Sequence, residues 1–302
     1  MKKKVLITGG SGFIGGWLGR LLRDRGFEVS NLDLVEPDST LSGIDYFKSD
    51  VRNKSEFRKI LGYGWDAVYH FAAIVSVPEC EKYPDQSFET NYSSTITLLE
   101  SVRSLARAPV VFFASSAAVY GDLCQKNMRL REDLSLPAPT SYYGLHKYAS
   151  EQSVRLYCKS FGIRGMSFRF FNVYGPGQKG DSPYSGVISK FKESFKNNRS
   201  VVLFNQGDNY RDFVHVQDIV SACSKALDLS PGQLNGDILN LCTGRSISVK
   251  ELYSELVRQE GKDPGFELAP PRIGDIQYSC GDASLAHDVL GWKPNSSLTL
   301  EF

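Results

Sequence analysis

Tyr143 and Lys147 are the residues of this 302-residue chain whose types and spacing most directly suggest chemistry. They lie four positions apart, so a helix would place both side chains on one face, one turn apart. A tyrosine with a pKa of about 10 is a poor base at neutral pH, but a nearby ammonium group favours the phenolate and lowers that pKa. Such a pair can move a proton to or from an alcohol or sugar hydroxyl. The same spacing is common on ordinary surface helices, so the rest of the chain has to decide.

A glycine-rich turn near the start of the chain is the second chemical signal. Residues 5–8 form an apolar run that predicts a buried parallel strand, residues 9–15 read Gly-Gly-Ser-Gly-Phe-Ile-Gly, and an amphipathic run to Arg25 predicts a helix. In this context the backbone N–H groups of the turn and the helix N-terminus can hold a dinucleotide pyrophosphate. The predicted cofactor contacts are Gly9, Gly12, Phe13, Ile14 and Gly15.

Asp33 indicates which dinucleotide the turn would bind. It ends the next expected strand, residues 27–32, at a distance from the glycines where a carboxylate can accept both ribose hydroxyls of adenosine. The same negative charge would repel a 2′-phosphate, which favours NAD over NADP. The alternative, a glycine turn with a solvated carboxylate, fits the strand context and the spacing less well.

Further apolar runs predict more strands of one parallel sheet, at 46–51, 66–70, 110–116 and 164–169. Ligands of open α/β sheets bind at the carboxyl ends of the strands. Ser116 ends one run, and its hydroxyl could hydrogen-bond a substrate hydroxyl and share its proton with Tyr143. Phe71, Ala72 and Ala73 follow another run, and the small alanines would let a cofactor lie close to the backbone. Asn91 falls in a long predicted helix, 85–106, and either contacts the cofactor or is a solvated polar residue.

The second half of the chain loses this alternation. Segment 170–184 is rich in Gly, Pro and Asn and predicts loops lining a cleft. Helices are expected at 187–196 and 249–260, and strands at 201–204 and 238–241. The expected fold is therefore α/β, a Rossmann-type doubly wound parallel sheet with a smaller C-terminal α/β substrate-binding lobe. The expected NAD-binding domain is 1–169 with a returning segment at about 210–242, and the lobe is 170–209 with 243–302.

Composition excludes several classes of protein. The formal net charge is +1 and charged residues make up 23%, so neither a nucleic acid nor a membrane surface is an expected partner. The six cysteines and four histidines show no metal-ligand spacing, and no metal is expected. The apolar run after the first lysines is too short for a signal peptide, so we expect free thiols and a cytoplasmic protein.

Six motifs, taken in order along nearly the whole chain, resemble those of the extended short-chain dehydrogenase/reductases, in the NAD-dependent nucleotide-sugar epimerase/dehydratase group. They are Thr8-Gly9-Gly10-Ser11-Gly12-Phe13-Ile14-Gly15, His70-Phe71-Ala72-Ala73, the Ser115–Gly121 stretch, Tyr143-Gly144-Leu145-His146-Lys147, the Arg169–Pro176 stretch and the Arg211–Val216 stretch. The resemblance implies a Rossmann-type NAD enzyme that acts on a nucleotide-sugar and forms a homodimer by packing helices 85–106 and 143–161 into a four-helix bundle.

The resemblance also implies roles for individual residues. Tyr143 would be the catalytic base, Lys147 its pKa partner and nicotinamide-ribose anchor, and Ser116 the hydroxyl relay. The further cofactor contacts would be Asp33 at the adenosine ribose, Asp50 and Val51 at the adenine, and Phe71, Ala72, Ala73, Asn91 and Phe170. The substrate contacts would be Ser76, Asn172, Val187, Arg211, Arg272, Asp275 and Ser279. Of these, Arg211 and Arg272 also suit two phosphates by their chemistry.

Two places narrow the reaction and the substrate. Related 4,6-dehydratases carry an Asp-Glu pair after the catalytic hydroxyl residue, where this chain has Ala117 and Ala118. Alanine cannot transfer protons, so elimination would lack its acid and base, whereas epimerisation at C4 needs only reversible oxidation by NAD. In similar 4-epimerases, the position of Ser279 gates the 2-substituent of the sugar. A serine leaves room, so we expect UDP-GlcNAc/UDP-GalNAc and/or UDP-Glc/UDP-Gal as substrates.

Two other interpretations remain at this stage. One is another nucleotide-sugar enzyme of the same family: a uronate 4-epimerase, or a 3,5-epimerase or reductase that acts on a keto sugar. The other is a non-catalytic NAD-binding regulator, which the intact Tyr143 and Lys147 pair disfavours.

Overall fold

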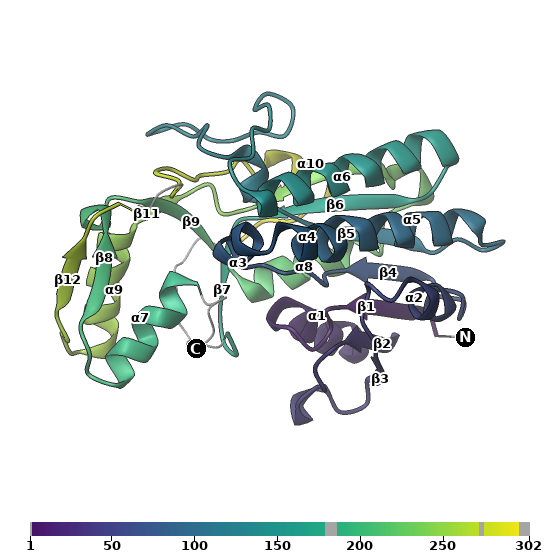
Figure 1. The fold of residues 1–302 in the computed structure, drawn as a ribbon, viewed down its shortest axis with the longest axis horizontal. Coiled ribbons are helices and arrows are strands. Elements are labelled where there is room, and N and C mark those ends of the chain that lie inside the picture. Colours follow the sequence, from purple (N-terminus) through teal and green to yellow (C-terminus); the bar gives the residue numbers. More distant parts are fainter. Residues whose placement is uncertain (1, 179–185, 272–274, 296–302) are drawn as a thin grey trace.

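A seven-stranded parallel sheet forms the larger part of the molecule (Figure 1). The computed structural model describes residues 2–178, 186–271 and 275–295. The strands follow the order β10-β6-β5-β4-β1-β2-β3 and are all parallel, which is the doubly wound arrangement that the apolar runs predict. Their bounds are β1 Lys4–Thr8, β2 Glu28–Asp33, β3 Asp45–Lys48, β4 Ala67–His70, β5 Val110–Ser116, β6 Gly165–Phe170 and β10 Asn235–Leu241.

Helices cover both faces of this sheet and close two hydrophobic cores. α1 (Phe13–Asp24) and α8 (Val216–Ala226) pack together on one face. On the other face, α5 (Ser94–Ser104) packs with α2 (Lys54–Leu61) and with α6 (Tyr142–Phe161). Along β1, Val5 and Ile7 belong to the first core and Leu6 to the second, because successive side chains of a strand point to opposite faces. A continuous apolar run is therefore what such a strand requires.

The helix that we predict over 85–106 is interrupted. It consists of α4 (Pro84–Phe88), one turn of π-helix (Glu89–Ser93) and α5, and it ends two residues earlier than predicted. Asn91 lies in the π turn and is buried, so the alternative that it is a solvated polar residue is wrong. A π turn inserts one extra residue into a helix, and such turns occur often at functional sites.

A smaller lobe built from two short sheets lies beside the large sheet, at the left of Figure 1. β7 (Asn172–Tyr174), β9 (Tyr210–His215) and β11 (Ser246–Ser248) form one sheet, and β8 (Val201–Phe204) pairs with β12 (Phe266–Ala269). α7 (Val187–Lys196) and α9 (Val249–Glu260) share a third core with these strands. The loop prediction for 170–184 is wrong at β7, where three residues pair with β9. No helix within the described ranges is long and apolar enough to cross a membrane.

Candidate active site

The start of helix α6 places the Tyr143 and Lys147 pair against the end of β5. Ser141 caps the helix by accepting the N–H of Gly144 at 3.1 Å. Gly144 lies so close to the turn that follows β5 that a Cβ atom there would stand 2.6 Å from the Ala118 carbonyl oxygen. The Lys147 Nζ donates to the Ala114 carbonyl at 2.7 Å and lies 5.9 Å from the Tyr143 ring centre. The prediction that Tyr143 and Lys147 lie on one face of a helix is confirmed, and the bond from Lys147 to β5 fixes the position of that face.

The charge state of this pair differs from the prediction. Burial raises the pKa of Tyr143 to about 12, and a hydrogen bond with Ser116 opposes that rise only in part. Burial also lowers the pKa of Lys147 to about 7. Burial therefore outweighs any lowering of the tyrosine pKa by the lysine ammonium, because desolvation disfavours both charged forms.

Ser116 lies at the carboxyl end of β5, as predicted, and close enough to Tyr143 to lower the pKa of the phenol. Its hydroxyl also accepts the N–H of Ala118 at 3.1 Å and so caps a short 3₁₀ turn, Ala117–Tyr120. The two residues directly after Ser116 are thus fixed beside the pair, and neither carries an acid or a base.

A buried ion pair behind Ser116 was missed by the sequence reasoning. The Glu151 carboxylate accepts the Ser115 hydroxyl at 2.6 Å and two bonds from Arg169, at 2.5 and 3.0 Å. Both charged side chains are almost inaccessible to solvent. Glu151 follows Tyr143 and Lys147 at the same four-residue spacing, and that repeat was the available signal. The pair holds the ends of β5 and β6 to helix α6.

The glycine turn has the close backbone packing that a dinucleotide site requires. A Cβ atom at Gly9, whose φ is +72°, would stand 2.8 Å from the Ala72 nitrogen, and one at Gly15 would stand 2.2 Å from the Gly9 oxygen. Helix α1 begins after Gly12 with no acidic residue in its first turn and no side-chain cap. The buried Ser11 hydroxyl beside this helix start has no partner within the described part of the chain. These features fit a bound pyrophosphate, which would be held by N–H groups of the helix start.

Asp33 connects the end of β2 to the glycine turn. Its carboxylate accepts the N–H of Ser11 at 3.0 Å and the N–H of Val35 at 3.1 Å. A carboxylate offers about four lone-pair sites, so acceptor capacity remains for two ribose hydroxyls. The residues present therefore fit NAD.

Most of the other predicted cofactor residues lie after β4, after β3 and at the start of α1. Phe71, Ala72 and Ala73 are partly exposed directly after β4, and the Phe71 ring meets the Phe170 ring edge to face at 5.7 Å. Asp50 is engaged by Arg52 at 2.6 Å, and Val51 is buried in the second core. Phe13 and Ile14, at the start of α1, pack partly buried against the first core.

Asn91, in the π turn, hydrogen-bonds both the loop that follows β4 and helix α6. Its side chain accepts the N–H of Ile74 at 2.8 Å and donates to the Ile74 oxygen at 2.9 Å. Its own carbonyl accepts the Ser150 hydroxyl at 2.8 Å. The contacts seen are thus protein contacts, which hold the loop after β4. Ser76, in that loop, caps helix α3 (Val77–Lys82) by accepting the Glu79 N–H at 3.3 Å.

Strand β9 gathers most of the predicted substrate residues into a second cluster. Arg211 donates to Asp275 at 2.7 Å, and burial lowers its pKa. Asn172, on the neighbouring β7, donates to the Asp212 carbonyl at 3.3 Å. Ser279 is buried, and its N–H bonds the Tyr210 carbonyl at 3.0 Å. Val187 begins helix α7 and is partly exposed. Arg272 lies outside the described residues.

Asp212 organises the loops around this cluster and was not predicted. It is fully buried and accepts the N–H groups of Thr243, Gly244 and Gly281 at 2.8, 2.9 and 3.3 Å, together with the Thr243 hydroxyl at 2.6 Å. Its partners lie 31 to 69 residues away, so no local pattern could have shown it. It fixes the backbone two residues beyond Ser279.

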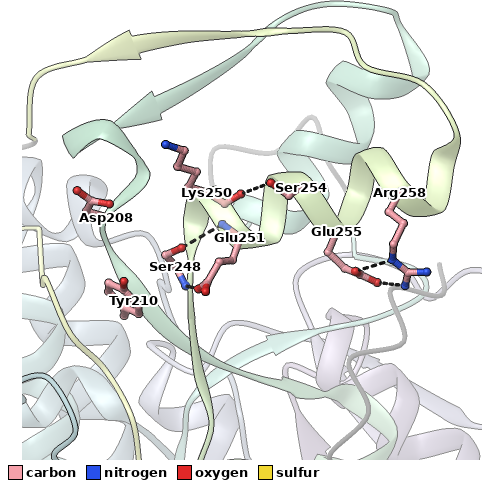
Figure 2. Close-up of a pocket in the computed structure, with 8 residues that line it drawn as sticks. All are labelled: Asp208, Tyr210, Ser248, Lys250, Glu251, Ser254, Glu255 and Arg258. Atoms are coloured by element: carbon pink, nitrogen blue, oxygen red, sulfur yellow. Dashed lines mark hydrogen bonds and ion pairs between the residues drawn. The ribbon is translucent and has the colours of Figure 1, made fainter.

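An open hollow of about 540 Å³ lies in the smaller lobe, between β9 and α9 (Figure 2). None of the predicted site residues lines it. Its charged groups largely satisfy one another, since Ser248 and Glu251 form a capping box and Glu255 pairs with Arg258. Among the described residues, no group of three His, Cys, Asp or Glu side chains could hold a metal ion. His70, between Thr8 and Ser94, and His146, against Ser87, make buried hydrogen bonds.

The fold is a doubly wound sheet with a dinucleotide-type glycine turn and a Ser-Tyr-Lys set at its carboxyl edge. These features define an enzyme class that uses a dinucleotide cofactor and acts on a substrate hydroxyl group. Residues 5–242 match the NAD dependent epimerase/dehydratase family, and the chain belongs to that family. It is 32% identical to a putative UDP-glucose 4-epimerase of Methanocaldococcus jannaschii, over 97% of this chain and 94% of the relative.

Solved structures agree with this assignment. A UDP-N-acetylglucosamine 4-epimerase from Methanobrevibacter ruminantium superposes with a TM-score of 0.90 at 29% identity, covering 99% of this chain and 96% of the other. A dTDP-glucose 4,6-dehydratase from Streptomyces venezuelae superposes with a TM-score of 0.87 at 26% identity, over 98% and 93%. The fold alone therefore does not separate epimerases from dehydratases.

Proposed function

We propose that this protein is an NAD-dependent nucleotide-sugar 4-epimerase, an isomerase that acts on a UDP-hexose. One observation carries the choice of reaction. The Ser116, Tyr143 and Lys147 set is complete, while the two residues held beside it, Ala117 and Ala118, cannot move a proton. Elimination needs an acid and a base at that point, whereas epimerisation does not.

The chain's own residues would act as follows. Tyr143 exchanges a proton with the C4 hydroxyl, Ser116 hydrogen-bonds the same oxygen, and Lys147 anchors the nicotinamide ribose and supplies positive charge near the phenol. Bound NAD supplies the hydride acceptor and, after the keto sugar has turned over, the hydride donor. Gly9, Gly12, Asp33 and the other predicted cofactor residues would hold NAD.

The substrate is proposed to be UDP-GlcNAc/UDP-GalNAc, UDP-Glc/UDP-Gal or both. Asn172, Arg211 and Arg272 would bind the phosphates, and Asp275 would orient Arg211, to which it is bonded. Ser279 would leave room for a 2-N-acetyl group. Residues 1–169 with about 210–242 would form the NAD-binding domain, and 170–209 with 243–302 the nucleotide-sugar lobe.

A panel of UDP-sugars followed by NMR tests the proposal. We expect the purified protein to interconvert C4 epimers without added NADH and without a net absorbance change at 340 nm. Conversion of only a UDP-uronate would indicate the related uronate 4-epimerase, and stoichiometric consumption of NADH would indicate a reductase. No conversion of any UDP-sugar by NAD-loaded protein would refute the proposal.

We further propose a cytoplasmic homodimer. Exposed apolar side chains lie along the outer side of α4 and α6, namely Phe88 at 43%, Leu145 at 46% and Leu156 at 60% exposure. A second copy packing α4–α5 and α6 into a four-helix bundle would cover them. All six cysteines are free thiols, which fits a reducing compartment. Sedimentation that shows only monomer at micromolar concentration would refute the dimer.

A further inference from the structure

One hydrogen bond joins the dinucleotide-binding helix directly to the smaller lobe. The indole Nε1 of Trp17, one turn into α1, donates to the Pro176 carbonyl at 2.9 Å across 159 residues of sequence. The Arg20 guanidinium lies 4.7 Å from the Trp17 ring centre and donates to Thr40 at 2.7 Å. The indole is therefore held in place on α1, and its N–H is aimed at the other lobe.

The turn that carries Pro176 has little freedom to adjust. Gly175 has a φ of +148°, and a Cβ atom there would stand 2.7 Å from the Val216 side chain. Gly177 also has positive φ, at +86°. On the far side of the turn, Gln178 donates to the Val173 carbonyl at 3.2 Å and accepts the Ser189 hydroxyl at 2.7 Å. The turn thus connects α1, β7 and α7.

β7 and α7 are the elements that carry Asn172 and Val187, two of the residues proposed to contact the nucleotide-sugar. The single N–H of the Trp17 side chain is bonded to Pro176, so Trp17 donates a hydrogen bond to neither Asn172 nor Val187. Its hydrogen bond instead sets the distance between α1, where NAD would bind, and the start of the sugar-nucleotide segment. We infer that Trp17 is a positioning residue for the nucleotide-sugar. This inference rests on the proposed function, and it assigns Trp17 an effect on substrate binding and none on the chemical step.

The test compares Trp17→Phe with a matched control, Trp65→Phe. Each variant removes one indole N–H bonded to a backbone carbonyl, but Trp65 bonds Ile60 near the end of helix α2, at 2.7 Å. Loss of one such bond predicts a rise of about three- to tenfold in KM for the UDP-sugar and in the Kd of UDP measured by calorimetry. We expect kcat and bound NAD to stay within about twofold of wild type. Trp65→Phe should leave both KM and the UDP Kd unchanged.

Trp17→His serves as a rescue variant, because an imidazole can also present a ring N–H to the carbonyl. It should recover most of the lost UDP affinity. The inference is overturned if Trp17→Phe leaves KM and the UDP Kd at wild-type values, if kcat and NAD content fall instead, or if Trp65→Phe has the same effect. UDP calorimetry on the wild type separates the two proposals, since a wild type that binds no UDP contradicts the proposed function itself.

Discussion

The two clusters of site residues are held in different ways. Lys147 and Ser116 are fixed by bonds to the backbone of β5 and its following turn, inside the large sheet. Arg211 is held by the Asp275 carboxylate at 2.7 Å and by the carbonyl oxygens of Tyr210 and Gln277 at 2.9 and 3.5 Å. The Arg211 and Asp275 side chains are 16% and 30% exposed. The first cluster is thus anchored to a core strand, whereas the second depends on an ion pair that is partly exposed to solvent.

This difference suggests a division of labour. A proton-transfer set has to be preorganised, because catalysis depends on small distances between reacting atoms. A site for phosphates and sugar substituents can differ between relatives without disturbing the sheet. Changes in the first cluster should therefore affect turnover, and changes in the second should affect which substrate binds and how tightly.

The largest effect is expected for Tyr143→Phe. Removing the phenol hydroxyl should lower kcat by about 10²–10⁴-fold, because the C4 hydroxyl loses its proton acceptor. NAD content, measured after denaturation of the purified protein, should remain close to wild type. Near-full turnover in this variant would show that Tyr143 is not the proton acceptor, and the proposed difference between the two clusters would not hold.

Ser279→Tyr should change substrate preference. A buried serine replaced by a tyrosine fills the space proposed for a 2-N-acetyl group. The ratio of kcat/KM for UDP-GlcNAc to that for UDP-Glc should fall by about 10–200-fold. Ser279→Ala is the control and should leave the ratio within about threefold. An unchanged ratio in the tyrosine variant would show that the gate lies elsewhere.

Arg211→Lys should weaken nucleotide-sugar binding. Lysine keeps the charge but loses the planar fork that binds a phosphate and Asp275 together. We expect KM to rise about tenfold with kcat nearly unchanged. A fall in kcat with constant KM would contradict the division of labour, because it would place Arg211 in the chemical step.

The smallest effect concerns stability near the first cluster. Burial, together with the charge of Lys147, lowers the pKa of His70 to about 3. The unfolded chain, with a pKa of 6.5, binds the proton that the folded protein excludes, so stability falls as pH drops from 6.5 toward 3. Between pH 6 and pH 5 the protonation of His70 in the unfolded chain lowers the free energy of unfolding by about 1 kcal/mol. Urea unfolding of His70→Asn should therefore show a decrease in the free energy of unfolding over this pH range that is smaller by about 1 kcal/mol. An equal dependence of the free energy of unfolding on pH in wild type and His70→Asn would contradict this prediction.

β1, β4 and β5 could be predicted because each is an apolar run with predicted site residues at or directly after its carboxyl end. β3, predicted over 46–51, spans only Asp45–Lys48, because this edge strand is polar and partly exposed and carries little signal. β7 and β11, at three residues each, could not, because their pairing with β9 decides them and no run of that length carries a period. The π turn at Asn91 also escaped prediction, and the bonds of Asn91 to Ile74 join residues 17 positions apart, which no local pattern reveals.

The site was predictable as residue types but not as partnerships. Tyr143, Lys147 and Ser116 follow from spacing and strand ends. The Glu151–Arg169 pair, the clamp at Asp212 and the bond between Arg211 and Asp275 join residues that are far apart in sequence. The pKa of Tyr143 also depends on burial, which residue spacing does not reveal.

The most direct test of the account follows the hydrogen on C4. UDP-glucose or UDP-GlcNAc carrying deuterium at C4 is incubated with the protein in ordinary water, and the epimeric product is analysed by NMR and mass spectrometry. If the hydride leaves C4 and returns to its opposite face within one site, the product keeps the deuterium at C4. Replacement of that deuterium by hydrogen from water during epimerisation would contradict the proposed mechanism.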